Sequence, residues 1–152
     1  MTIFIRPIQL GDRAAWQPLW EGYNAFYGRS GTTALPDEIT NTTWARFFDD
    51  AEPVHALVAE RRRGELLGLV HYLFHRSTTR IEPVCYLQDL FTVPEARGQK
   101  IGHALIERVY LAAREAGAKR VYWQTQSTNA TARALYDRVA QHLGFIVYTH
   151  EV

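Results

Sequence analysis

The spacing of apolar side chains divides the first half of the chain into two helices and a hairpin. After a short strand at residues 3–6, apolar and aromatic residues recur every three or four positions behind Asp12, a residue type favoured at helix N-caps. The residues after Pro36 show a similar spacing of apolar side chains. Residues 54–60 and 65–75 are strand-like and are joined by three arginines and a glycine. This pattern predicts two amphipathic helices followed by a β-hairpin.

The second half of the chain alternates strands with helices. A strand at residues 86–93 ends at Pro94, which cannot donate to a sheet ladder, and a helix with an apolar face then runs to about residue 116. Because strand–helix–strand crossovers normally join parallel strands, we expect the next strand to run parallel to residues 86–93. The remaining predicted elements are a strand at residues 120–125, a helix at residues 129–139 and a last strand at residues 144–149.

Composition limits the class of protein. With 152 residues and 47% hydrophobic content, the chain can build one domain, residues 1–152, around a real core. A net charge of +1 gives no basic field that favours nucleic acid, and no apolar run is long enough to span a membrane. Arg6 and Pro7 come too early for a signal peptide, so we expect a cytoplasmic protein.

Cysteine and histidine form no metal or disulfide pattern. The single cysteine, Cys85, cannot pair within the chain, and its place in a strand predicts a buried, inert thiol. His71 and His75 are four residues apart on a strand rather than on a helix, with no cluster of cysteines and histidines to complete a site. We therefore expect no metal site.

The turn between the strand at residues 86–93 and the next helix is a candidate anion site. Gly98 and Gly102 lie in it, with the positive charges of Arg97 and Lys100 beside them. Free amides and the dipole at a helix N-terminus attract anions, phosphates among them. The turn lacks the Gly-Lys-Ser/Thr ending of a P-loop and the third glycine of the dinucleotide fingerprint. Taken alone, it is equally consistent with an ordinary strand-to-helix turn.

A second motif lies downstream, where Asn129, Ala132, Leu135 and Tyr136 share one helix. With Arg97 and Gly102 of the turn, it resembles the motifs of the GNAT superfamily of acetyl-CoA-dependent N-acetyltransferases. That family usually has glycine where this chain has Lys100. The string YLQDLF at residues 86–91 resembles a string of diamine acetyltransferases, and residues 121–123 resemble a histone-and-polyamine acetyltransferase subgroup.

The resemblance implies the α/β GNAT fold, with a mixed sheet of six to seven strands flanked by about four helices. It implies transfer of acetyl from acetyl-CoA to a primary amine, with a small amine, polyamine or amino acid as first choice of acceptor. A protein lysine or N-terminus, and a non-catalytic acyl-CoA-binding module, stay open as alternatives. Relatives are commonly homodimers, so we expect a homodimer here. Because Val139 and Ala140 separate the tyrosine motif from Gly144-Phe145, we expect a shortened final strand pair and a C-terminus that leans on a partner subunit.

The resemblance also implies roles for individual residues. Tyr136 is expected beside the CoA sulfur, as the acid that protonates the departing thiolate, although a core tyrosine is the alternative. A backbone amide near Leu90 or Phe91 is expected to stabilise the oxyanion. The residues expected to hold acetyl-CoA are Leu90, Phe91, Val93, Arg97, Gly98, Gln99, Lys100, Ile101, Gly102, His103, Asn129 and Arg133.

The acceptor side is defined less sharply. A carboxylate at Asp89, surrounded by apolar strand residues, should have a raised pKa if buried and would suit a base or an anchor for the amine. A structural, hydrogen-bonded Asp89 is the alternative, and Glu82, Glu21 or a water chain are rival bases. The first helix carries polar groups at its far end that could line an acceptor pocket: Glu21, Tyr23, Asn24 and Tyr27.

Overall fold

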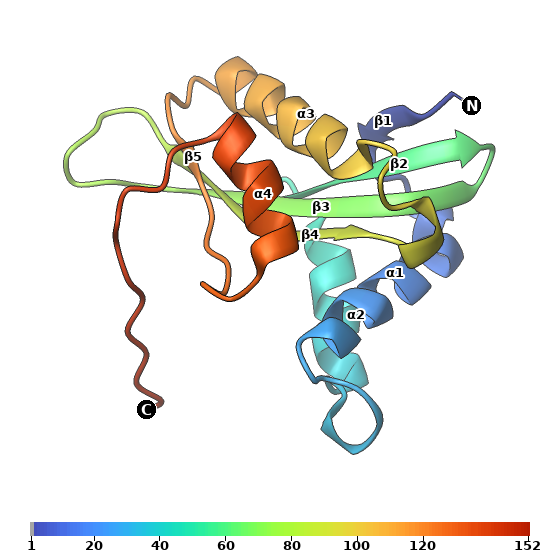
Figure 1. The fold of residues 1–152 in the computed structure, drawn as a ribbon. Helices are drawn as coiled ribbons and strands as arrows, with labels where there is room; N and C mark the ends of the chain where they lie inside the picture. The colour runs from blue at the N-terminus through green and yellow to red at the C-terminus, as the bar shows by residue number, and fades with distance from the viewer. Residues whose placement is uncertain (1) are drawn as a thin grey trace.

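The computed structural model describes residues 2–152, and its centre is one mixed sheet of five strands in the order β1-β2-β3-β4-β5 (Figure 1). Neighbouring strands are antiparallel from β1 to β4, and β5 runs parallel to β4, as the crossover predicted. The strands are β1 (Phe4–Pro7), β2 (Val54–Arg62), β3 (Glu65–His75), β4 (Val84–Thr92) and β5 (Val121–Tyr122).

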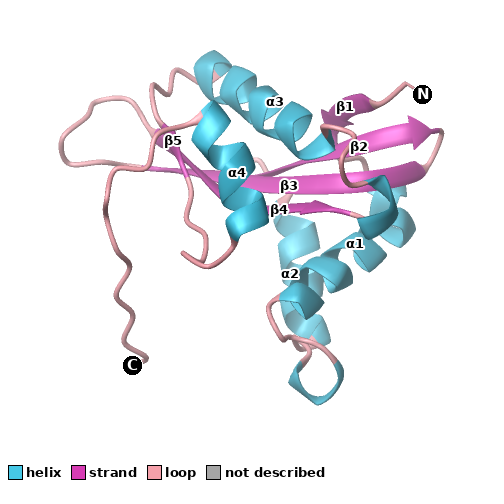
Figure 2. Cartoon of the chain, in the orientation of Figure 1, coloured by secondary structure: helices cyan, strands magenta, loops and turns pink. Residues whose placement is uncertain are grey.

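Helices cover both faces of the sheet (Figure 2). One face carries the first two helices and the other carries the last two. Because alternate strand residues point to opposite faces, each strand contributes side chains to both cores. On β2, for example, Ala56 and Val58 belong to the core beneath the early helices, whereas Leu57 and Ala59 belong to the core beneath the later ones. The helices are α1 (Arg13–Phe26), α2 (Asp37–Arg46), α3 (Ile101–Glu115) and α4 (Ala130–Val139), with three short 3₁₀ turns, η1 (Leu10–Asp12), η2 (Gly31–Thr33) and η3 (Pro94–Ala96).

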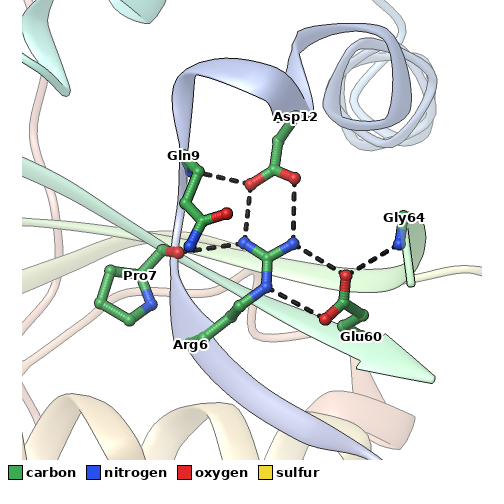
Figure 3. A network of polar contacts seen from close by, with 6 residues as sticks. All are labelled: Arg6, Pro7, Gln9, Asp12, Glu60 and Gly64. Atoms are coloured by element: carbon green, nitrogen blue, oxygen red, sulfur yellow. Dashed lines mark hydrogen bonds and ion pairs between the residues drawn. The ribbon is translucent and has the colours of Figure 1, made fainter. Parts of the chain in front are cut away.

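An ion-pair network links β1 to β2 and to η1 (Figure 3). The guanidinium of Arg6 lies 2.7 Å from Asp12 Oδ2 and 2.9 Å from Glu60 Oε2. Asp12 also accepts a hydrogen bond from the Gln9 amide at 2.8 Å, so it stands at the N-cap of α1 without capping that helix through its side chain. The hydrogen bonds from Arg6 and from the Gly64 amide lower the pKa of Glu60 to about 2.

Two expectations about strands are wrong. The predicted last strand at residues 144–149 does not form, and residues 141–152 are extended without any secondary structure. The strand predicted at residues 120–125 is reduced to Val121–Tyr122, because the chain leaves the edge of β4 at that point. The sheet therefore has five strands rather than six or seven, because strand formation depends on a neighbouring edge that the sequence of the segment does not describe.

Candidate active site

The sheet opens between β4 and β5. Within residues 2–152 these strands pair at Cys85 with Val121 and at Tyr86 with Tyr122, and no strand covers the rest of that edge of β4. The amide of Val93 donates to Leu67 on β3 at 2.9 Å. Because amides alternate between the two edges of a strand, the amide of Phe91 also faces β3 and that of Leu90 faces the open edge. Of the two amides expected to stabilise an oxyanion, only the Leu90 amide points into the opening.

The turn at residues 97–102 has an unusual backbone. Gly98 has φ +81° and Lys100 has φ +62°, and Lys100 is the one non-glycine residue among residues 2–152 with a positive φ. Glycine adopts this left-handed conformation freely, but for lysine it costs roughly 1–2 kcal/mol. Helix α3 begins at Ile101, directly after Lys100, so the first amides of α3 have no acceptor within the helix.

Two close contacts fix the position of this turn. Gly68 of β3 has no side chain, and a Cβ there would lie 3.1 Å from Ile101 and 3.2 Å from Leu105, so α3 approaches the sheet closely. Arg97 donates through Nε to the carbonyl of Thr92 at 3.1 Å, and its guanidinium lies over the ring of Phe91 at 5.7 Å. The start of α3, with its free amides and two cationic side chains, is thereby held beside the open edge of β4.

Tyr136 lies on α4, next to the start of α3. Asn129 caps α4 by accepting the Ala132 amide at 3.3 Å, which confirms the predicted cap. A Cβ on Gly102 would lie 3.4 Å from Leu135, so α4 packs directly on the first turn of α3. The ring of Tyr136 meets Trp123 edge-on, with ring centroids 5.4 Å apart. Burial raises the pKa of Tyr136, so its phenol stays protonated at neutral pH.

Asp89 is buried and belongs to a chain of hydrogen bonds. The indole Nε1 of Trp16 donates to His71 Nε2 at 3.1 Å, and His71 Nδ1 lies 2.9 Å from Asp89 Oδ2. Because an indole only donates, His71 Nε2 must accept, and the proton on Nδ1 is directed at Asp89. Burial and the charge of Asp89 raise the pKa of the nearby Tyr23. Asp89 is therefore held by His71, with the Tyr23 hydroxyl close by.

A β-bulge places Asp89. His71 pairs with Asp89 and the next residue, Tyr72, pairs with Leu87, so Gln88 is one residue in excess on β4. A bulge of this kind bends its strand and redirects the neighbouring side chains. As a result, Asp89 lies opposite His71 on the α1–α2 face of the sheet. The sequence analysis considered His71 only as a metal ligand and did not predict its contact with Asp89.

A cavity of about 200 Å³ lies beside Asp89, between α1, α2 and the sheet. Besides Asp89, the charged side chain that lines this cavity is Arg46 of α2, whose guanidinium makes a long ion pair of 3.8 Å with Glu52. Aromatic and aliphatic side chains supply the apolar wall. The lining residues are Trp20, Thr43, Arg46, Phe47, Val54, His71, Tyr72, Leu73, Gln88 and Asp89. Arg46, Trp20 and Phe47 were not among the predicted site residues.

The four residues expected to line an acceptor pocket separate in the structure. Tyr23 lies beside Asp89, and Tyr27 is partly exposed at the end of α1. Asn24 is buried, but its side chain is engaged, donating to the Trp20 carbonyl at 2.9 Å and accepting from Arg29 at 2.7 Å. Glu21 is exposed and accepts from Gln17 at 3.1 Å. None of the four lines the cavity beside Asp89.

Other titratable groups are poor candidates for the chemistry. Glu82 has a lowered pKa because of a backbone hydrogen bond and its contact with Arg80, which makes it a weak base. Burial raises the pKa of Cys85 to about 12, so its thiol is inert at neutral pH, as expected. Within residues 2–152 there is no group of three or more metal-binding side chains, and no helix there is long and apolar enough to cross a membrane.

Comparison with known proteins decides the family. The model of the acetyltransferase (GNAT) family matches residues 16–141. The chain belongs to the GNAT family. It is therefore an N-acetyltransferase, acetyl-CoA is its acetyl donor, and the mixed α/β fold expected from the resemblance is confirmed. The finer resemblance to the diamine and polyamine subgroup stays a prediction.

Relatives of this GNAT enzyme include a D-amino-acid N-acetyltransferase, HPA3, of Saccharomyces cerevisiae, which is 36% identical over 96% of this chain and 89% of that protein. The uncharacterized N-acetyltransferase YhfO of Bacillus subtilis is 30% identical over 95% of this chain and 94% of that protein. Among solved structures, the aminoglycoside acetyltransferase AAC(6')-Iy in complex with a bisubstrate analogue matches with a TM-score of 0.81 at 13% identity, over 100% of this chain and 99% of that one. At that identity the likeness shows the fold alone.

Proposed function

We propose that this enzyme transfers the acetyl group of acetyl-CoA to the amino group of a small amino acid. The observation that carries the proposal is that Asp89 and Arg46 line the same cavity of about 200 Å³. At neutral pH an α-amino acid carries an ammonium and a carboxylate attached to the same carbon atom. A cavity with one acidic and one guanidinium side chain has the two charges that such a zwitterion requires.

Asp89 suits the ammonium. Its carboxylate is buried, lines the cavity and accepts a hydrogen bond from His71 at 2.9 Å, and a carboxylate has further lone pairs that can accept from a bound ammonium. In this proposal the same carboxylate takes the proton that the ammonium releases before the amine attacks.

Arg46 suits the carboxylate. Its side chain is half exposed and its ion pair with Glu52 is 3.8 Å long, so a carboxylate could replace Glu52 at small cost. A guanidinium binds carboxylates through two parallel hydrogen bonds, which also orients the bound group.

The same lining disfavours a polyamine. A second ammonium needs a second acidic group, and Asp89 is the only acidic residue among those that line the cavity, where Arg46 would repel an added positive charge. The activity named for the yeast relative, D-amino-acid N-acetylation, agrees with an amino acid acceptor.

The donor side of the site would hold acetyl-CoA at the turn of residues 97–102. The free amides at the start of α3 and the charges of Arg97 and Lys100 fit a pyrophosphate, and the open edge of β4 fits the extended arm of CoA. Of the other residues expected at the donor site, Asn129 and Arg133 lie at the start of α4, and the rest lie at the end of β4, in the turn or in the first turn of α3. Acetyl-CoA supplies the acetyl group as a reactive thioester.

Two groups of the chain serve the reaction itself. The Leu90 amide, which points into the opening beside β4, is placed to donate to an oxygen that gains negative charge. Tyr136 Oη holds a proton at neutral pH, because burial raises its pKa, and can deliver it to the departing sulfur.

A panel of acceptors tests the proposal by following release of free CoA thiol. Each amino acid, in both enantiomers, is paired with the amine that lacks its carboxylate, for example leucine with isoamylamine and phenylalanine with phenethylamine. We expect the amino acids to have kcat/KM values at least tenfold higher than their decarboxylated partners. Equal values within the pairs, or a polyamine as the best acceptor, would contradict the proposal.

A further inference from the structure

A second and larger cavity lies beneath the C-terminal half of α3. Its volume is about 580 Å³, which is within the usual range for small-molecule sites, and it is open to solvent. The start of β2 and the end of β3 contribute to its lining. Because β1 ends at Pro7, opposite Leu57, no strand within residues 2–152 covers the outer edge of β2 before that residue. The cavity therefore lies where the sheet is least covered.

Three aromatic rings form one wall of this cavity. His55 of β2 stacks on Tyr72 of β3 with ring centroids 5.2 Å apart, and Phe74 meets the two rings edge-on, at 5.6 Å and 5.9 Å. Burial lowers the pKa of His55, so its ring is neutral at neutral pH. The wall therefore offers flat, uncharged surface, which suits an aromatic or aliphatic side chain of a ligand.

The hydroxyl of Tyr72 has no protein partner. Tyr72 is only 7% exposed, yet no group among residues 2–152 forms a hydrogen bond with this hydroxyl. Buried polar groups normally have such a partner. Burial raises the pKa of Tyr72, so its phenol keeps a proton that it can donate to a ligand. The charges of Arg108 and Glu115 also act on this phenol, which places both side chains near it.

Helix α3 supplies the opposite wall. Arg108, Ala112 and Glu115 follow one another at spacings of four and three residues, so their side chains share one face of the helix. Within residues 2–152 neither Arg108 nor Glu115 forms an ion pair, so both charges are available to a ligand. α3 ends at Glu115, where the helix dipole adds partial negative charge and favours a cation.

We propose that this cavity is a second binding site, for a free α-amino acid with an aromatic or aliphatic side chain. The carboxylate of the ligand binds Arg108 and accepts a hydrogen bond from the Tyr72 hydroxyl, and its ammonium binds Glu115 at the end of α3. The side chain of the ligand lies on the aromatic wall. A polyamine would bring a positive charge to Arg108, and a dicarboxylate would bring a negative charge to Glu115, so both fit less well.

This site is separate from the acceptor cavity beside Asp89. Phe47 and Tyr72 line both cavities, so the two are neighbours, but Asp89 lines only the acceptor cavity and Arg108 only the second one. The turn proposed for acetyl-CoA lies at the start of α3, roughly 20 Å along the helix from Glu115. A ligand in the second site is therefore held without being acetylated, and the proposal goes beyond the function proposed above.

Calorimetric titration with each enantiomer of phenylalanine tests the proposal. The starting protein is Arg46→Met, whose acceptor cavity lacks its guanidinium, so that binding there does not obscure the second site. We expect one phenylalanine per chain in this protein, and at least tenfold weaker binding when Arg108→Met is added. Arg114→Met is the matched control, because Arg114 is exposed on the same helix and lines neither cavity, so its replacement should leave the affinity unchanged.

A second variant and two analogues of phenylalanine test the polar contacts. Tyr72→Phe keeps the aromatic ring but removes the hydroxyl, so the affinity should fall severalfold while the circular dichroism spectrum and Tm stay close to those of the starting protein. Phenethylamine, which lacks the carboxylate, and 3-phenylpropanoate, which lacks the ammonium, should each bind at least tenfold more weakly than phenylalanine.

Three results would overturn the proposal. They are the absence of binding to the Arg46→Met protein at millimolar phenylalanine, an affinity that Arg108→Met leaves unchanged, and analogues that bind as tightly as phenylalanine. The proposed function is tested by release of CoA thiol, which these titrations do not measure. The two proposals can therefore fail independently of each other.

Discussion

Replacing Lys100 with glycine should raise the stability of the fold and weaken the binding of acetyl-CoA at the same time. Lys100 has φ +62°, a conformation that costs a residue with a side chain roughly 1–2 kcal/mol. Glycine avoids this cost but loses about 0.5–1 kcal/mol through its more flexible unfolded state. The net gain should be about 0.5–1 kcal/mol, or a rise in Tm of roughly 1–4 °C for a chain of this size.

The change also removes a positive charge from the turn that we propose for the pyrophosphate. A unit charge about 4 Å from a phosphate contributes on the order of 1 kcal/mol in a solvated setting, so the Kd for acetyl-CoA should rise about fivefold. Thermal unfolding measures the first effect, and calorimetric titration at two salt concentrations measures the second, because salt screens exposed charges.

Lys100→Ala separates the two effects. It removes the same charge but keeps a side chain in the left-handed conformation, so it should weaken acetyl-CoA binding as much as Lys100→Gly without any gain in Tm. The backbone argument is refuted if the alanine variant is as stable as the glycine variant. The electrostatic argument is refuted if neither variant changes the Kd for acetyl-CoA.

Three further predictions address the proton donor, the buried hydrogen bonds and the response to acid. Tyr136→Phe should keep the affinity for acetyl-CoA but lower kcat by about one to three orders of magnitude, and an unchanged kcat would remove Tyr136 from the mechanism. His71→Leu should destabilise the fold by roughly 2 kcal/mol or more in urea titration, since Trp16 and Asp89 each lose a buried hydrogen-bond partner worth about 1–3 kcal/mol. The KM of this variant for the acceptor should also rise. The pKa of Glu60 is lowered from 4.5 to about 2, so the charged carboxylate stabilises the fold above pH 4.5 and this contribution is lost as the pH falls toward 2. Across this range the unfolding free energy of Glu60→Gln should therefore fall less than that of the wild type.

The sequence predicted the elements whose signals are local. The apolar spacing after Asp12, the cap at Asn129 and the strand ending at Pro94 all depend on residues close together in the chain, and each appears in the structure. The fold and the donor could also be anticipated, because the motifs around Arg97 and Tyr136 resemble those of the family to which the chain belongs.

What the sequence did not reveal depends on contacts between distant residues. His71 and Asp89 are 18 positions apart, and their contact requires both the pairing of β3 with β4 and the extra residue at Gln88. Arg46 looks like an ordinary exposed residue on a short helix until α2 is placed over the sheet. The strand predicted at residues 144–149 failed for the same reason, since its partner edge is not encoded within the segment.

The measurement that tests the central claim most directly combines a change in the enzyme with a change in the acceptor. The values of kcat/KM for leucine and isoamylamine are determined for the wild type and for Arg46→Met, which keeps the length of the side chain but removes its charge. We predict that Arg46→Met lowers the preference for leucine at least tenfold and leaves isoamylamine almost unaffected, a coupling of about 1.4 kcal/mol or more. The same preference in both enzymes would contradict the pairing of Arg46 with the acceptor carboxylate.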